Sequence, residues 1–291
     1  MKILLTGCGG QVGYELERSL QGLGEVVAVD RARMDLSNLD QVRAVIRDVR
    51  PQLIVNPAAY TAVDKAESEP ALAFRINAEA PGVMAEEARR LGAVLVHYST
   101  DYVFPGTEPG ARAETDATGP VNVYGASKLA GERAIAASGA AHLILRTSWV
   151  YGMRGRNFLL TMLRLARERD ELRVVADQHG APTWSRTVAD TTATILAQAR
   201  AHGSSAGFDA GWWQECGGIY HLSSQGRTTW FGFTQAIVEQ AGIDCRVVPI
   251  ASAEYPTPAR RPQYSVLSSR RLLERFGHVP DWQEALRLCM Q

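Results

Sequence analysis

Tyr124 and Lys128 are spaced for acid–base chemistry on one face of a helix. Side chains at i and i+4 are neighbours on a helix, so the ammonium can stabilise a phenolate and lower the pKa of the tyrosine. A tyrosine tuned in this way can donate a proton to a carbonyl oxygen as hydride reaches the carbonyl carbon. Many helices contain this spacing by chance, so the pair predicts the chemistry only together with other features.

The glycines Gly7, Gly10 and Gly13 predict a dinucleotide site. They follow a short apolar run and open a segment of helical periodicity. Glycine lets the backbone approach a pyrophosphate closely, and the free N–H groups at a helix start favour negative charge. A plain strand-to-helix turn is the alternative, but the order of strand, glycines and helix favours the dinucleotide.

Asp30 closes the second apolar run, where an acidic side chain accepts hydrogen bonds from the adenosine ribose. Its position favours NAD. Arg31 and Arg33 follow, and a guanidinium there can pair with the 2′-phosphate of NADP. The alternative for the two arginines is an ordinary charged surface turn. We therefore expect NADPH or NADH to serve as cofactor, with Asp35 and Leu36 bordering the adenine.

Two further strand ends carry residues suited to a ligand site. The third apolar run ends in residues 56–61, whose small side chains leave space for a cofactor at the carboxyl end of a strand. The fourth ends in Tyr98, Ser99 and Thr100, followed by Asp101. Taken alone, residues 56–61 would be only a tight turn.

Alternating strands and helices must position these residues. The predicted strands are residues 3–5, 26–29, 53–55, 94–96 and 143–145, and the predicted helices are residues 15–20, 39–49, 71–91 and 124–137. Continuous apolar strands between helical segments predict a parallel sheet covered on both faces. Right-handed crossovers then give an α/β fold of the Rossmann type, a doubly wound parallel sheet.

The regularity weakens after residue 150, which predicts a smaller C-terminal α/β lobe for the substrate. We expect residues 1–150 to form the dinucleotide-binding domain and residues 151–291 to form mainly the substrate-binding lobe, with chain exchange between lobes. Helices are predicted at residues 158–167 and 188–201. Residues 202–218 are rich in Gly and Ser and are predicted to be a surface loop.

The composition of the chain argues against some classes of binding partner. The chain has 291 residues, and its 31 basic and 31 acidic side chains give a formal net charge of +0. No global field therefore favours nucleic acid or an anionic membrane. The four widely spaced cysteines and the lack of a leader or membrane span predict a cytoplasmic protein.

The three glycines, the strand-end Ser-Thr and the Tyr-x-x-x-Lys pair occur in the order that is typical of extended short-chain dehydrogenases/reductases, which the chain resembles. Residues 56–65, 99–106, 146–151, 177–183 and 255–262 further resemble the dTDP-4-dehydrorhamnose reductase family. That resemblance covers nearly the whole chain. It implies a reductase that transfers hydride from NAD(P)H to the C4 ketone of dTDP-4-dehydro-β-L-rhamnose, giving dTDP-β-L-rhamnose.

The resemblance also implies roles for individual residues. Tyr124 would be the general acid, Lys128 would tune it and hold the nicotinamide ribose, and Thr100 would hydrogen-bond the reacting oxygen. Thr100, Asp101 and Trp149 would line the sugar site, although Trp149 could equally be core packing; the other five tryptophans, Trp230 among them, are expected to pack structurally. The residues expected at the cofactor are Gly7, Gly10, Gln11, Val12, Gly13, Asp30, Asp35, Leu36, Ala59, Tyr60, Thr61, Tyr98, Tyr124 and Lys128. Arg260 or Arg261 would hold the diphosphate or belong to a surface loop.

A departure from the family pattern concerns metal. Some members hold Mg²⁺ between subunits with acidic side chains, whereas here the region reads Trp184, Ser185 and Arg186. A guanidinium cannot ligate a hard cation. Glu15 remains, but a glutamate on a surface helix is usually solvated. We therefore predict that no metal is needed, and we expect a homodimer.

Three alternatives stay open at this point. A dehydratase of the same fold typically carries Asp-Glu after the strand-end threonine, but here Tyr102 follows Asp101. A C4 epimerase also uses Tyr-x-x-x-Lys, although it is usually longer and keeps its NAD bound. A regulatory subunit of methionine adenosyltransferase would share the fold without the reaction, and intact Thr100, Tyr124 and Lys128 favour an enzyme over it.

Overall fold

Six parallel strands form the central sheet of the larger lobe, as the computed structural model of residues 1–203 and 208–291 shows. Across the sheet their order is β10 (Gly218–His221), β5 (His142–Thr147), β4 (Val94–Thr100), β3 (Leu53–Asn56), β1 (Lys2–Leu5) and β2 (Glu25–Ala28). Every neighbouring pair runs parallel. The predicted Rossmann-type sheet is thus confirmed, with all five expected strands in place.

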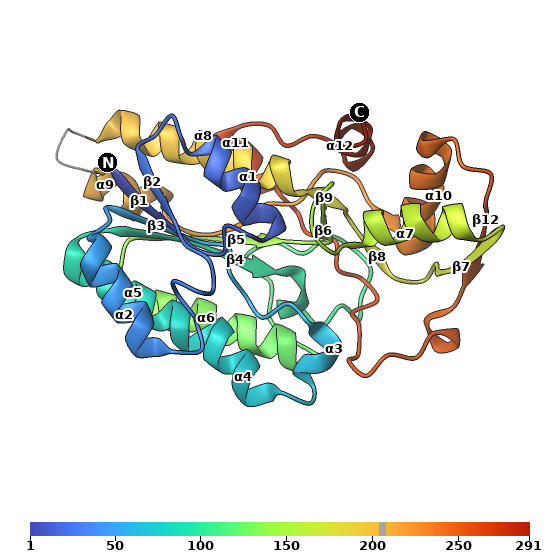
Figure 1. Ribbon diagram of the computed structural model, residues 1–291, viewed down its shortest axis with the longest axis horizontal. Helices are drawn as coiled ribbons and strands as arrows, with labels where there is room; N and C mark the ends of the chain where they lie inside the picture. The colour runs from blue at the N-terminus through green and yellow to red at the C-terminus, as the bar shows by residue number, and fades with distance from the viewer. Residues whose placement is uncertain (204–207) are drawn as a thin grey trace.

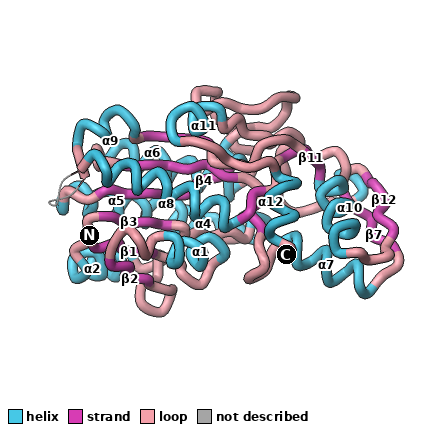
Figure 2. Tube along the Cα trace, turned by 90° about the horizontal axis from the view of Figure 1, so that it is seen from above, coloured by secondary structure: helices cyan, strands magenta, loops and turns pink. Residues whose placement is uncertain are grey.

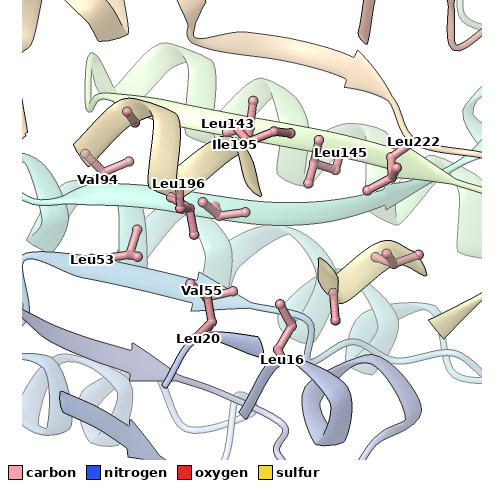
Figure 3. Packing of buried hydrophobic residues seen from close by; sticks show 14 of the residues in the cluster. Leu16, Leu20, Leu53, Val55, Val94, Leu143, Leu145, Ile195, Leu196 and Leu222 are labelled. Carbon is pink, nitrogen blue, oxygen red and sulfur yellow. The ribbon is translucent and has the colours of Figure 1, made fainter. Parts of the chain in front are cut away.

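Helices cover both faces of this sheet (Figure 1). One face carries α2 (Leu39–Val49), α5 (Ala80–Leu91) and α6 (Val123–Ser138), and the other carries α1 (Gln11–Ser19) and α8 (Ser185–His202). Alternate strand residues point to opposite faces, so Leu4 and Ile54 pack under the first group, and Leu53 and Val55 under the second. Figure 3 shows the second layer, where Leu16 of α1, Leu20 just after it, and Ile195 and Leu196 of α8 meet the strands.

The predicted helix over residues 71–91 is interrupted by a wider turn. The structure has α4 (Pro70–Phe74), a π-helical turn η1 (Arg75–Glu79) and then α5. Asn77 lies in this turn and is fully buried. Its amide accepts from the N–H of Tyr60 at 2.8 Å and donates to the carbonyl of Tyr60 at 3.0 Å. The amide of Asn77 in the π turn therefore fixes the backbone of the loop after β3 at Tyr60.

A second lobe lies at one end of the larger one (Figure 2). Helices α7 (Phe158–Glu168) and α10 (Trp230–Ala241) pack on the parallel pair β7 (Glu171–Val175) and β12 (Arg246–Ile250), with α12 (Trp282–Cys289) beside them. Two short pairs, β6 (Val150–Tyr151) with β9 (Thr183–Trp184) and β8 (His179–Gly180) with β11 (Thr228–Thr229), lie where the lobes join. Helix α8 and strand β10 follow residue 150 in the sequence but pack in the larger lobe. The division into a cofactor domain of residues 1–150 and a substrate lobe of residues 151–291 therefore stays a prediction.

The segment 202–218 differs from the predicted surface loop. Helix α9 (Ala210–Cys216) forms within it, and Trp213 is buried in the core of the larger lobe; residues 204–207 lie outside the described part. The remaining short elements are α3 (Val63–Ala66), η2 (Asp101–Val103), η3 (Ser252–Glu254) and α11 (Arg270–Phe276). Among the described helices, none combines the length and apolarity that crossing a bilayer requires.

Candidate active site

The strand order creates a crevice at the carboxyl ends of the sheet. Strand β1 lies between β2 and β3, so the chain reverses its direction of progress across the sheet at β1, and open α/β sheets bind ligands at such a point. A hollow of about 840 Å³ opens there, and we call it the central hollow. Of the residues expected at the cofactor, the sugar or the reaction, all but Arg33, Arg260 and Arg261 line it. A smaller hollow of about 300 Å³ beside α8 and α12 contains none of them.

The glycine loop has the shape that a pyrophosphate needs. Gly7 has φ of 57°, and a Cβ there would lie 2.9 Å from the Cβ of Ala58. At Gly13 a Cβ would overlap the carbonyl oxygen of Gly7. Helix α1 begins after Gly10, and no side chain caps it within the described part of the chain. The first N–H groups of α1 thus remain for a ligand, so the loop fits a bound dinucleotide.

Charged groups of both signs meet at the end of β2. The Nε of Arg31 lies 3.2 Å from Oδ2 of Asp35, and Oδ1 of Asp30 accepts from the N–H of Arg33 at 3.1 Å. The N–H and hydroxyl of Ser37 hold the pKa of Asp35 below its usual value. Arg31 lines the central hollow, whereas Arg33 is not among its lining residues. Of the two arginines, Arg31 is therefore the one placed to meet a 2′-phosphate.

Thr100 and Asp101 stand where β4 passes into η2. The hydroxyl of Thr100 donates to Oδ1 of Asp101 at 2.9 Å and accepts from the N–H of Tyr102 at 3.2 Å. Asp101 is almost fully buried, and its Oδ2 has no partner among the described residues. Burial raises the pKa of Asp101 to about 6. Asp101 lines the central hollow, and a hydrogen bond from a sugar hydroxyl that reached this buried oxygen would offset the cost of its desolvation.

Tyr124 and Lys128 lie on the first turns of α6, which Asn122 caps by accepting from the N–H of Gly125 at 2.8 Å. Nζ of Lys128 donates to the carbonyl of Tyr98 at 2.6 Å and lies 3.1 Å from Nε2 of His97. Burial lowers the pKa of Lys128 to about 8.

The expected lowering of the tyrosine pKa does not appear in the structure. Burial instead raises the pKa of Tyr124 to about 12, while the neighbouring Thr100 hydroxyl acts in the opposite direction. Burial is the largest cause of the raised value, and Lys128 makes its hydrogen bonds to His97 and to the backbone of Tyr98 rather than to the phenol. Tyr124 is thus fully protonated at neutral pH, which suits a proton donor.

Trp149 forms the wall of the hollow towards the second lobe. It is a non-glycine residue with positive φ, 48°, a conformation that costs energy and that neighbours must enforce. Its indole stacks on that of Trp230 with ring centroids 3.5 Å apart, and a Cβ at Gly180 would overlap it. Trp230 was expected to have a packing role only, and it packs on Trp149, a candidate sugar-binding residue. Its Nε1 donates to Gln178 at 3.2 Å.

Some predicted residues face elsewhere, and some lining residues were not predicted. The hydroxyl of Tyr98 pairs with Thr192 of α8 at 2.8 Å, and Arg261 forks onto Asp64 with both distances 2.8 Å. Arg260 and Arg261 are absent from the lining of the central hollow. Asn157 lines it and donates to Gln11 at 2.9 Å. No local pattern marks Asn157, because its contact joins α7 of the second lobe to the glycine loop.

The metal prediction is untested. Arg186 pairs with Asp190 at 3.5 Å on α8. No three His, Cys, Asp or Glu side chains gather as ligands in the described ranges.

Comparison with known proteins places this geometry in context. Residues 1–291 match the profile of the family described as "RmlD substrate binding domain". The dTDP-4-dehydrorhamnose reductase of Burkholderia thailandensis is 50% identical over 100% of this chain and 98% of its own, and that of Escherichia coli K12 is 46% identical over 99% and 96%. A reductase of the same name from Bacillus anthracis, solved in complex with NADP, is 36% identical with a TM-score of 0.89 over 99% of this chain and 98% of its own.

Proposed function

The chain belongs to the RmlD substrate binding domain family, and we propose on this basis that it reduces the C4 ketone of dTDP-4-dehydro-β-L-rhamnose to give dTDP-β-L-rhamnose. It is an NAD(P)H-dependent oxidoreductase of dTDP-rhamnose synthesis, as its named relatives and the NADP complex of one of them indicate. The observation that carries the residue assignments is the convergence of Tyr124, Lys128, Thr100 and the glycine loop on one hollow.

Two residues of the central hollow take part in the proton transfer and the polarisation of the ketone. The bound nicotinamide supplies the hydride. Tyr124 holds a proton at its phenol oxygen and gives it to the C4 oxygen, since a group with a pKa of about 12 is protonated at neutral pH. Thr100 donates a hydrogen bond to the same oxygen when it turns from Asp101, which polarises the ketone.

Binding and orientation fall to the other residues. Lys128 holds the nicotinamide ribose, and the glycine loop holds the pyrophosphate. Asp101 accepts from a sugar hydroxyl through its free Oδ2, while the indole of Trp149 packs on the apolar C6 methyl edge.

Turnover tests the proposal directly. Purified protein with NADPH or NADH should lose nicotinamide absorbance when dTDP-4-dehydro-β-L-rhamnose is added, with dTDP-β-L-rhamnose as product. A dehydratase or epimerase would act on a dTDP-hexose with no net consumption of NAD(P)H. If the keto-sugar is untouched with both cofactors while the protein binds methionine adenosyltransferase, the regulatory assignment replaces this one.

We further propose a cytoplasmic homodimer that binds a small dTDP-sugar, with neither nucleic acid nor membrane as partner. The balanced charge supports this, as do the four cysteines, which form no disulfide in the described structure. Sedimentation equilibrium of the purified protein would decide between monomer and dimer.

A further inference from the structure

A line of four buried polar side chains runs behind the central hollow, from the residue after β1 across β3 and β4 to α6. The hydroxyl of Thr6 lies 2.6 Å from Oδ1 of Asn56, Nδ2 of Asn56 lies 3.1 Å from Nδ1 of His97, and Nε2 of His97 lies 3.1 Å from Nζ of Lys128. Asn56 and His97 are fully buried, and Lys128 is 2% exposed. Of these residues only Lys128 has a part in the proposed reaction, so the rest of the line has no role yet.

The charge of Lys128 fixes the direction of every hydrogen bond in this line. An ammonium has three donors and no acceptor, and the carbonyl of Tyr98 takes one donor. His97 must then accept at Nε2 and carry its proton on Nδ1. Asn56 must in turn accept from Nδ1–H through Oδ1 and donate to Thr6 through Nδ2. The third ammonium donor is left for the hollow that Lys128 lines.

The opposite direction fits a neutral lysine. Thr6 then donates to Oδ1 of Asn56, Nδ2 donates to Nδ1 of His97, and Nε2–H of His97 donates to the amine. The structure holds the amide of Asn56 in this second orientation. Turning the amide exchanges two groups of equal size, so the same cavity accommodates both directions.

His97 stays uncharged in both arrangements. Burial holds its pKa well below the ordinary value, and the adjacent Lys128 acts in the same sense. Around Lys128, Glu132 on α6 raises its pKa but is itself paired with Arg146 of β5 at 2.7 Å. Tyr124 and Asp101 line the same hollow from α6 and η2.

We propose that His97 is a positioning residue for Lys128: its imidazole accepts from the ammonium at Nε2, with the amide of Asn56 turned to accept from Nδ1–H, and so aims the remaining ammonium donor at the cofactor. Only the kinetic consequence of this inference rests on the proposed function. The tautomer itself is a property of the folded protein and can be measured without turnover.

Histidine-selective ¹⁵N NMR of the full chain tests the tautomer. Between pH 6 and pH 10 the His97 ring should pass from the Nδ1–H to the Nε2–H form, while remaining neutral. In Lys128→Met this pH step should vanish. His221 is a matched control, because it is equally buried and has no bond to Lys128. An imidazolium at His97 in this range, or the same tautomer step in Lys128→Met, would overturn the proposal.

Kinetics test the consequence. His97→Phe keeps a flat ring but removes the acceptor, and it should lower kcat about tenfold, the loss of one hydrogen bond to a charge, with little change in KM for the keto-sugar. The basic limb of its kcat–pH profile should move to lower pH. His97→Gln offers an amide oxygen in place of Nε2 and should restore part of the loss.

An unchanged pH profile in His97→Phe would contradict the positioning role. If His97→Phe does not fold, Thr6→Val at the far end of the line gives the same test through the tautomer. Failure of the wild type to reduce the keto-sugar would refute the proposed function, but the NMR titration would still decide the role of His97.

Discussion

Replacing Lys128 by methionine should abolish turnover and yet stabilise the fold near neutral pH. Lys128 is buried, and burial lowers the pKa of its ammonium from 10.5 to about 8, against the opposing effect of Glu132. At neutral pH the folded protein therefore keeps the Lys128 ammonium charged in a buried environment that destabilises the charge. Methionine has a similar length and fills the same space without a charge.

The size of the effect follows from this shift in pKa. At about 1.4 kcal/mol for each pH unit, the fall from 10.5 to about 8 corresponds to about 3 kcal/mol of cost below pH 8. The variant also leaves the carbonyl of Tyr98 and the ring nitrogen of His97 without a donor, at about 1 kcal/mol each, the lower end of the range for a buried unpaired group. The net gain in the free energy of unfolding is then about 1–2 kcal/mol at pH 7, which raises Tm by roughly 2–3 °C for a chain of this length.

The pH dependence has a definite sign. Between pH 8 and 10.5 the unfolded chain binds more protons at this lysine than the folded protein does, so the stability of the wild type rises with pH in that window. Lys128→Met lacks this group, and its advantage should shrink to nothing or reverse by pH 10.

Thermal unfolding followed by circular dichroism at pH 7 and pH 9.5 measures both effects. Lys65→Met is the matched control, because Lys65 is exposed on the surface in a pair with Glu69, and its Tm should change by about 1 °C or less. A lower Tm for Lys128→Met at pH 7, or a gain that is equal at both pH values, would refute the reasoning.

The remaining predictions concern the central hollow. Tyr124→Phe removes the proton donor and should lower kcat by about 10²-fold or more with cofactor affinity unchanged; near-normal turnover in stopped assays would remove Tyr124 from its role. Arg31→Ala should weaken the binding of NADPH by about tenfold and leave the binding of NADH unchanged in fluorescence titrations. Arg33 does not line the hollow, so Arg33→Ala should change neither affinity. Equal losses of affinity for both cofactors in Arg31→Ala would exclude a contact with the 2′-phosphate. Gly180→Ala puts a Cβ against the indole of Trp149 and should raise KM for the keto-sugar several-fold more than it lowers kcat; an unchanged KM would show that the indole does not contact the sugar.

Local patterns were sufficient to predict the sheet and the cofactor end of the site. Continuous apolar runs marked each of the first five strands, and the predicted helix over residues 39–49 has the same bounds in the structure, because Asn38 caps its start and its apolar face is regular. Gly7, Gly10 and Gly13 are informative because sterics at one short loop determine their role. Such signals lie within a few residues of the feature that they predict.

Features that depend on distant partners could not be predicted. The amide of Asn77, in the π turn, bonds the backbone of Tyr60, and nothing near residue 77 in the sequence shows that contact. Trp213 is buried because α9 docks on a core assembled from other segments. Burial raises the pKa of Tyr124, and Lys128 makes its hydrogen bonds to Tyr98 and to His97, which lies on a strand far away in sequence. Spacing alone could place the lysine beside the tyrosine but could not give the direction of its donors.

Strand β10 has a consequence for how the chain is made. It completes the sheet at the edge of β5, yet 75 residues separate Arg146 from His221. At about 5–20 residues per second, a ribosome needs roughly 4–15 s to supply them. During that interval β5 presents an unpaired apolar edge that can pair with another nascent chain. We therefore expect a chain truncated before residue 218 to aggregate even though it contains the whole glycine loop, Tyr124 and Lys128, and synthesis in vivo to depend on chaperones holding that edge until its last strand emerges.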